Sequence, residues 1–255
     1  MTELLHYTQL GQGEPLLILH GLFGSSKNWH SLAKQFAEKF TVYSVDLRNH
    51  GSSFHDAQMN YQVMAEDVEA LINHLGLQPY SIIGHSMGGK TAMLCALRCR
   101  HKISKLVVAD IAPVNYQHSH TDLIGPILAI DLNRVSSRAQ VDKTLATDIS
   151  DPMLRGFLLQ NLGREGDSWY WKVNWRAIQQ QMDALVDFPL NSDDNTDIPA
   201  LFIRGENSDY VDDRGITAIH QTFGNARIET MSNAGHWLHA EQPQKFTELV
   251  LHFLG

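Results

Sequence analysis

The feature that most constrains the fold is a regular alternation between short apolar runs and longer segments with helical periodicity. The runs occupy residues 15–20, 41–46, 80–84 and 106–110, and helical patterns lie between them near residues 29–39, 63–75 and 87–100. Such alternation is typical of strand-helix-strand units, which build a parallel sheet. In open sheets of this kind the chemistry gathers beyond the carboxyl ends of the strands. Residues directly after each run are therefore the candidates for a functional site.

The alternation stops after Pro113 and resumes near residue 199. The intervening residues 113–198 show helical patterns and no convincing buried strand. We therefore expect an α/β core made of residues 1–112 and 199–255, with residues 113–198 inserted as a helical cap. A length of 255 residues suits one α/β domain with an insertion.

The strongest motif is the sequence GHSMGG at residues 84–89, a G-x-S-x-G match between an apolar run and a helical segment. A sharp strand-to-helix turn there would hold the Ser86 hydroxyl clear of the sheet, and small neighbours would let the backbones approach closely. The backbone N–H of Met87 would lie at a helix N-terminus, where it can stabilise an oxyanion. We predict Ser86 as the nucleophile and Met87 as an oxyanion donor.

A serine nucleophile needs a base, and fourteen histidines are available. His236 follows the last apolar run, at residues 226–231, by five residues, precedes the final helical segment and has a glycine beside it. This is the place that the order nucleophile, acid, histidine requires. We predict His236 as the general base and treat His239 as a helix-entry residue.

The first long run ends in the glycine-containing turn HGLFGS, at residues 20–25. Its free backbone N–H groups could supply the second oxyanion donor, which we assign to Leu22. A phosphate-binding loop is the alternative, but neither G-x-G-x-x-G nor a P-loop lysine pattern is present. The segment at residues 46–52 is expected to brace these loops by hydrogen bonding.

Two aspartates stand at strand ends where the acid that orients His236 could lie. Asp110 ends the run that follows the nucleophile segment, and Asp209 follows the run that resumes behind the insertion. The usual Gly-x-x-Asp pattern would place the acid at residue 208, which is a serine. The residues alone leave both aspartates open.

The insertion contains an aromatic cluster that includes Trp171 and Trp175. We expect these two side chains to line an apolar acyl pocket. Ordinary packing of the rings beneath the cap is the alternative.

The sequence resembles the α/β-hydrolase family over its whole length, because HGLFGS, DLRNHGSS, GHSMGG and NAGHW follow one another in the family's order. Its segments LRNHG, GHSMGGK, DIAPV and AGHWLHAEQP are similar to those of YbfF-type esterases and abhydrolase-domain 11 proteins. The resemblance implies a sheet of about eight mostly parallel strands with helices on both faces, a helical cap, and activity on acyl esters. It also implies Ser86, His236, Leu22 and Met87 in the roles above, and places the acid at Asp110, with Asp209 in reserve.

The expected reaction is acyl transfer to Ser86 followed by hydrolysis, on a small-molecule acyl ester and without metal or cofactor. No H-E-x-x-H motif or zinc-spaced cysteine pair is present. A thioesterase, a C–C bond hydrolase or a perhydrolase could use the same residues. Dehalogenases and epoxide hydrolases of this fold need an aspartate in place of Ser86. The alternative from a different functional class is a non-catalytic receptor that keeps the hydrolase fold as a binding pocket.

Charge and hydropathy limit the partners. Acidic residues outnumber basic ones by 28 to 20, which disfavours nucleic acid. No apolar stretch approaches the roughly 18 residues of a membrane span, and the first residues do not form a signal peptide. We therefore expect no membrane span and a cytoplasmic location.

Overall fold

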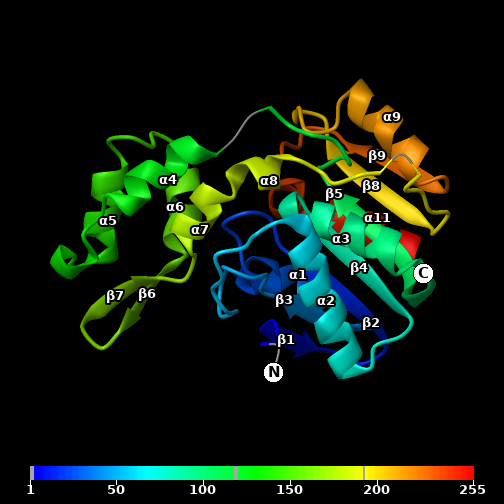
Figure 1. Cartoon of the computed structure of the whole chain (residues 1–255), viewed down its shortest axis with the longest axis horizontal. Helices are drawn as coiled ribbons and strands as arrows, with labels where there is room; N and C mark the ends of the chain where they lie inside the picture. The colour runs from blue at the N-terminus through cyan, green and yellow to red at the C-terminus, as the bar shows by residue number, and fades with distance from the viewer. Residues whose placement is uncertain (1–2, 118–119, 192) are drawn as a thin grey trace.

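The computed structural model describes residues 3–117, 120–191 and 193–255. It confirms the predicted fold class, with a central sheet in the strand order β1-β3-β2-β4-β5-β8-β9 and helices on both faces (Figure 1). The strands are β1 (Tyr7–Leu10), β2 (Glu14–Leu19), β3 (Phe40–Val45), β4 (Tyr80–His85), β5 (Ile103–Ala109), β8 (Ala200–Gly205) and β9 (Ala226–Met231). All neighbours pair in parallel except β1, which pairs antiparallel with β3. Among the described residues this sheet has seven strands where about eight were expected.

The strands are apolar on both faces because two separate helical layers cover the sheet. One layer contains η1 (Ser26–Trp29), α1 (His30–Phe36), α10 (Leu238–Glu241) and α11 (Pro243–Leu254), and the other contains α2 (Tyr61–Leu75), α3 (Met87–Arg98) and α9 (Asp213–Thr222). The short η2 (Arg100–Lys102) follows α3. Successive strand residues alternate between the two cores, as in the fully buried neighbours Ile82 and Ile83. Both faces of the central strands are therefore closed to solvent, and their ends remain for a site.

The segment between β5 and β8 gathers at one side of the molecule, in green and yellow in Figure 1. Its helices are α4 (Thr121–Leu128), η3 (Leu132–Arg134), α5 (Arg138–Leu145), α6 (Pro152–Leu159), α7 (Trp175–Gln180) and α8 (Met182–Val186). The insertion was expected to be helical, and besides its helices it contains an antiparallel hairpin of β6 (Leu162–Glu165) and β7 (Ser168–Trp171). Aromatic residues favour strands, and Gly166 adopts the positive φ of 57° that a tight hairpin turn needs.

Hydrogen bonds connect this insertion to the core at several points, three of which show where it lies. Asn161 donates from its side chain to the Phe23 carbonyl at 2.8 Å, and the Tyr61 hydroxyl donates to the Leu185 carbonyl at 2.7 Å. The backbone N–H of Asn174 donates to the Asn49 carbonyl at 3.0 Å. The insertion therefore lies against the loops that follow β2 and β3. None of the helices in the described ranges has the length and hydropathy needed to cross a bilayer.

Candidate active site

Ser86 lies in the sharp turn between β4 and α3. Its backbone has φ 51° and ψ −118°, outside the regions that most residues occupy. The turn also needs a close approach of two chains, because a Cβ atom on Gly88 would lie 2.4 Å from the Leu19 carbonyl oxygen. The sequence pattern of small residues around Ser86 thus has a direct steric cause, and the strain holds the hydroxyl at the end of the sheet.

His236 lies in the loop between β9 and α10. Its Nε2 atom is 3.1 Å from the Ser86 hydroxyl oxygen. The loop lies close to the end of β8, and a Cβ atom on Gly205 would be 2.4 Å from the Gly235 carbonyl oxygen. Residues 150 positions apart in the chain are thus brought within hydrogen-bond distance.

Asp110 directly follows β5 and is fully buried, with a positive φ of 51°. His236 Nδ1 lies 2.7 Å from its Oδ2 atom, and the Gly205 backbone N–H donates to its Oδ1 atom at 2.9 Å. The Ser208 hydroxyl also donates to Oδ2. Asp209 is exposed, and within the described ranges it forms no hydrogen bond or ion pair with His236. The structure therefore brings Ser86, His236 and Asp110 together and leaves Asp209 outside.

These contacts assign the histidine tautomer. A carboxylate only accepts hydrogen bonds, so Nδ1 of His236 carries the proton that it donates to Asp110. Nε2 of the neutral ring is then an acceptor, and the Ser86 hydroxyl donates to it. This is the arrangement in which a histidine can remove a serine proton.

Two residues of the site were missed in the sequence analysis. Ser208 occupies the place after β8 where a Gly-x-x-Asp pattern would have its acid, and it donates to Asp110. The Tyr210 ring stacks on the His236 ring, with centroids 3.9 Å apart and an interplanar angle of 17°. Burial, followed by the charge of Asp110, raises the pKa of Tyr210 to about 12, so the phenol stays neutral beside the imidazole. The sequence signal that could have identified Ser208 was a serine at the position where the Gly-x-x-Asp pattern has its acid.

Two further histidines lie behind His236 and are buried. His85 donates from Nε2 to the His236 carbonyl at 2.9 Å, and its ring is tilted against His239 at 4.4 Å between centroids. His239 stacks almost parallel on Trp29, so it packs in the core as well as standing at the entry of α10. Burial lowers the pKa of His85 well below its usual value and that of His239 to about 3. Both rings are therefore neutral supports for the loop of His236.

The turn after β2 presents its backbone toward Ser86. The Phe23 N–H donates to His50 Nε2 at 3.1 Å and is thus occupied. The N–H groups of Leu22 and Met87 donate to no other residue in the part of the chain that the structure describes. Leu22, Met87 and Ser86 line one common cavity. These two N–H groups are the available donors for an oxyanion.

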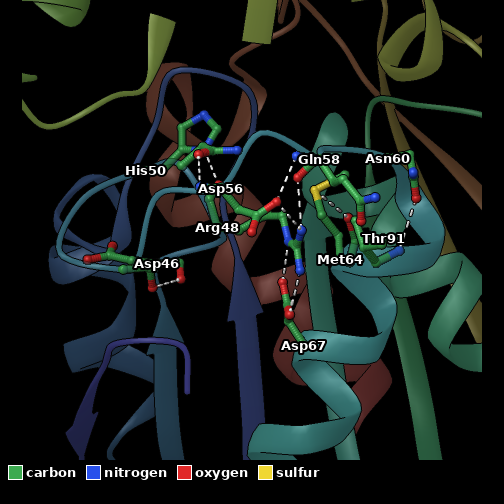
Figure 2. Close-up of polar contacts among 12 residues, drawn as sticks. Asp46, Arg48, His50, Asp56, Gln58, Asn60, Met64, Asp67 and Thr91 are labelled. Carbon is green, nitrogen blue, oxygen red and sulfur yellow. Dashed lines mark hydrogen bonds and ion pairs between the residues drawn. The ribbon is translucent and has the colours of Figure 1, made fainter. Parts of the chain in front are cut away.

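The segment at residues 46–52 braces these loops. The Asp46 carboxylate accepts from the Ser26 N–H at 2.7 Å and from the Ser52 N–H at 2.9 Å. Figure 2 shows Arg48 pointing from the same loop to Asp67 on α2, and its Nε and Nη2 atoms donate to that carboxylate at 2.5 and 2.8 Å. A buried, bidentate ion pair of this kind fixes the loop that carries His50.

Comparisons with known proteins place this arrangement in a family. The model of the alpha/beta hydrolase fold family matches residues 14–243. The chain belongs to the α/β-hydrolase family. A mouse relative named sn-1-specific diacylglycerol lipase ABHD11 is 38% identical over 248 residues, which cover 94% of this chain and 80% of the relative. Esterase YbfF of Escherichia coli is 33% identical over 94% of this chain and 93% of its own length.

A solved structure of a marine microorganism esterase is also similar to this α/β hydrolase. It has a TM-score of 0.96 and 40% sequence identity, with 99% of this chain and 100% of that chain covered. The predicted resemblance to YbfF-type and abhydrolase-domain 11 proteins is thereby confirmed. The chain is an enzyme of the esterase and lipase group within the family.

Ser86 of this hydrolase lies where two cavities meet. The larger, of about 240 Å³, is mainly apolar, and Leu123, Leu154, Phe157 and Trp237 contribute to its wall beside His236. The smaller, of about 40 Å³, lies on the side of α3 and α8 and is bounded by Tyr61, Lys90, Tyr116, Met182 and Leu185, among others. The space around Ser86 therefore has a larger, mainly apolar part and a smaller part that the amino group of Lys90 lines.

Trp171 and Trp175 are absent from the walls of both cavities beside Ser86. Trp175 is 2% exposed and packs against Phe23 at 4.9 Å between ring centroids. Trp171 packs edge-on against Trp175 at 5.8 Å. Since Phe23 does line the larger cavity, the two tryptophans form a layer behind its wall.

Proposed function

We propose that this chain is a serine esterase that hydrolyses small-molecule acyl esters through a Ser86–His236–Asp110 triad and an acyl-enzyme intermediate. The observation that carries the proposal is the continuous hydrogen-bond chain from the Ser86 hydroxyl through His236 to buried Asp110. In such a chain each member orients the next.

In the first half-reaction His236 Nε2 takes the Ser86 proton as the serine oxygen attacks the ester carbonyl carbon. The N–H groups of Leu22 and Met87 donate to the oxyanion of the tetrahedral intermediate. That intermediate collapses, the C–O bond to the alcohol breaks, and the His236 imidazolium returns the proton to the leaving alcohol. Water then attacks the acyl-enzyme with the same base, which releases the acid and restores Ser86.

The substrate is an ester whose apolar portion fits the larger cavity beside Ser86. Its walls are mainly aliphatic and aromatic, so binding there removes apolar surface from water. Residues 113–198 act as the cap in this proposal, because Leu123, Leu154 and Phe157 of the insertion contribute to that wall. The relatives named as esterases and a lipase support ester chemistry at this site.

Turnover of activated and alkyl esters of graded acyl length, with acyl-CoA thioesters in parallel, tests the proposal. Ser86→Ala should lower kcat by about 10⁵-fold or more and shift the unfolding midpoint by only a few degrees. Ser168→Ala, at an exposed position on β7, is the matched control and should keep full activity. Hydrolysis that persists in Ser86→Ala, or thioester turnover without ester turnover, would contradict the proposal.

A further inference from the structure

The side chain of Lys90 is buried beside the nucleophile, with a role that the triad does not explain. Lys90 lies one helical turn after Ser86 on α3, and its backbone N–H donates to the Ser86 carbonyl at 3.0 Å. The side chain is 1% exposed and lines the small cavity that also contacts Ser86. The amino group of Lys90 thus lies beside the same small cavity as Ser86.

The Lys90 ammonium is held by neutral groups. Nζ donates to the backbone carbonyls of Val186 at 3.0 Å and Asp187 at 2.8 Å, and it lies 4.7 Å from the centre of the Tyr116 ring. Within the described ranges no carboxylate forms an ion pair with it. Even the Asp187 carboxylate accepts elsewhere, from the Phe188 N–H at 2.8 Å. Two of the three N–H bonds of Lys90 are therefore used, and among the described residues the Asp187 carboxylate acts on its charge only from beyond ion-pair distance.

Arg48 provides the contrast within the same molecule. It is 8% exposed, and its guanidinium donates two hydrogen bonds to the Asp67 carboxylate (Figure 2). Buried charges are costly unless they are paired, and Arg48 obeys this rule with a partner from its own chain. Lys90 has no carboxylate within ion-pair distance in the described ranges, so an anion from outside would supply the pairing that Arg48 has within its own chain.

We propose that Lys90 forms an anion subsite beside Ser86, which selects esters whose acyl chain ends in a carboxylate, such as half-esters of short dicarboxylic acids. The inference rests on the proposed ester hydrolysis by Ser86. Its geometric basis is the small cavity, which adjoins Ser86 on one side and Lys90 on the other. A cavity of about 40 Å³ has room for a short chain end of a few heavy atoms.

Two tyrosine hydroxyls that line this cavity already donate their protons to backbone carbonyls, which leaves Lys90 to bind an anion. The Tyr61 hydroxyl donates to the Leu185 carbonyl at 2.7 Å, and the Tyr116 hydroxyl donates to the Tyr210 carbonyl at 2.6 Å. Both hydroxyl protons are thus engaged, whereas Lys90 has a third N–H and a full charge to offer. Burial lowers the pKa of Lys90 to about 7, and a bound carboxylate would favour the charged form again.

Matched ester pairs separate this role from a purely structural one. Monoethyl succinate, glutarate and adipate are compared with ethyl butyrate, pentanoate and hexanoate, which have the same numbers of acyl carbons. The measured quantity is the ratio of kcat/KM for each half-ester to that of its neutral partner. Lys90→Met keeps the length of the side chain and removes the charge, so we expect this ratio to fall at least tenfold.

Lys105 is the matched control because its Nζ also donates to two backbone carbonyls, of Phe253 at 3.0 Å and Leu254 at 2.7 Å, far from Ser86 in the fold. Lys105→Met should leave the ratio unchanged. If Lys90 only holds the α8 end of the insertion, Lys90→Met lowers both kcat/KM values together. A ratio that changes less than threefold would overturn the anion subsite.

A second measurement needs only the wild-type protein and covers the case in which Lys90→Met does not fold. Succinate, glutarate and adipate should inhibit neutral ester hydrolysis at least tenfold more tightly than butyrate, pentanoate and hexanoate. Equal inhibition by mono- and dicarboxylates would overturn the inference. Absence of any ester turnover by the wild type would instead overturn the proposed function, so the two failures are distinguishable.

Discussion

The strand ends of the core and the inserted segment both contribute to the space around Ser86, but they do so by different physical means. At the strand ends, Asp110 is fixed by hydrogen bonds from three other residues and by a strained backbone. In the insertion, Leu154 and Phe157 contribute through apolar surface, and Trp175 packs against Phe23 of the core behind the cavity wall. A hydrogen bond depends on the positions of two particular atoms, whereas apolar packing tolerates changes in side-chain shape.

This difference predicts that substitutions at the strand ends change the rate of reaction, while those in the insertion change substrate choice or stability.

After Ser86 itself, the largest effect is expected at the acid. Asp110→Asn removes the charge that orients the Nδ1–H of His236 and stabilises the imidazolium, so kcat should fall by up to about 10⁴-fold, as in the serine-protease template. Asp209→Asn changes an exposed side chain at the neighbouring strand end and should stay within about twofold of the wild type. Steady-state kinetics with one activated ester measures both. If kcat falls in Asp209→Asn and not in Asp110→Asn, the assignment of the acid to Asp110 is wrong.

The smaller effects belong to the insertion. Phe157→Ala enlarges the larger cavity and removes apolar contact, so KM for long-chain esters should rise about tenfold with little change in kcat. Trp175→Ala should lower the free energy of unfolding by about 3–5 kcal/mol, because the ring is buried, with unchanged acyl preference.

Denaturant unfolding and a chain-length series measure these two effects. A changed acyl preference in Trp175→Ala with intact stability would show that the ring contacts substrate after all. The tryptophans would then have the pocket-lining role that the sequence analysis expected.

The central strands and the position of Ser86 could be predicted from the sequence because their causes are local. Strands buried on both faces need continuous apolar runs, and the turn at Ser86 needs small residues at fixed positions. Strand β1 was missed because it is a four-residue edge strand with partly exposed side chains and no apolar run. The β6–β7 hairpin was missed because it packs outside the main sheet.

The remaining site residues depend on contacts between distant parts of the chain. Ser208 and Asp110 are 98 positions apart, and the Lys90 ammonium binds carbonyls 96 and 97 positions away. A serine after β8 and a lysine after GHSMGG are visible in the sequence, but only the fold shows which atoms they meet. The same holds for Trp171 and Trp175, whose pattern suits a pocket wall and a packed layer equally well.

The central claim is that Ser86 is the nucleophile, and intact-mass measurement after treatment with a fluorophosphonate tests it most directly. The account predicts one adduct per chain, located on the peptide that contains Ser86, with loss of esterase activity in proportion to labelling. Ser86→Ala should gain no mass, and Ser168→Ala should label as the wild type does. An adduct on another residue, or full labelling of Ser86→Ala, would contradict the account.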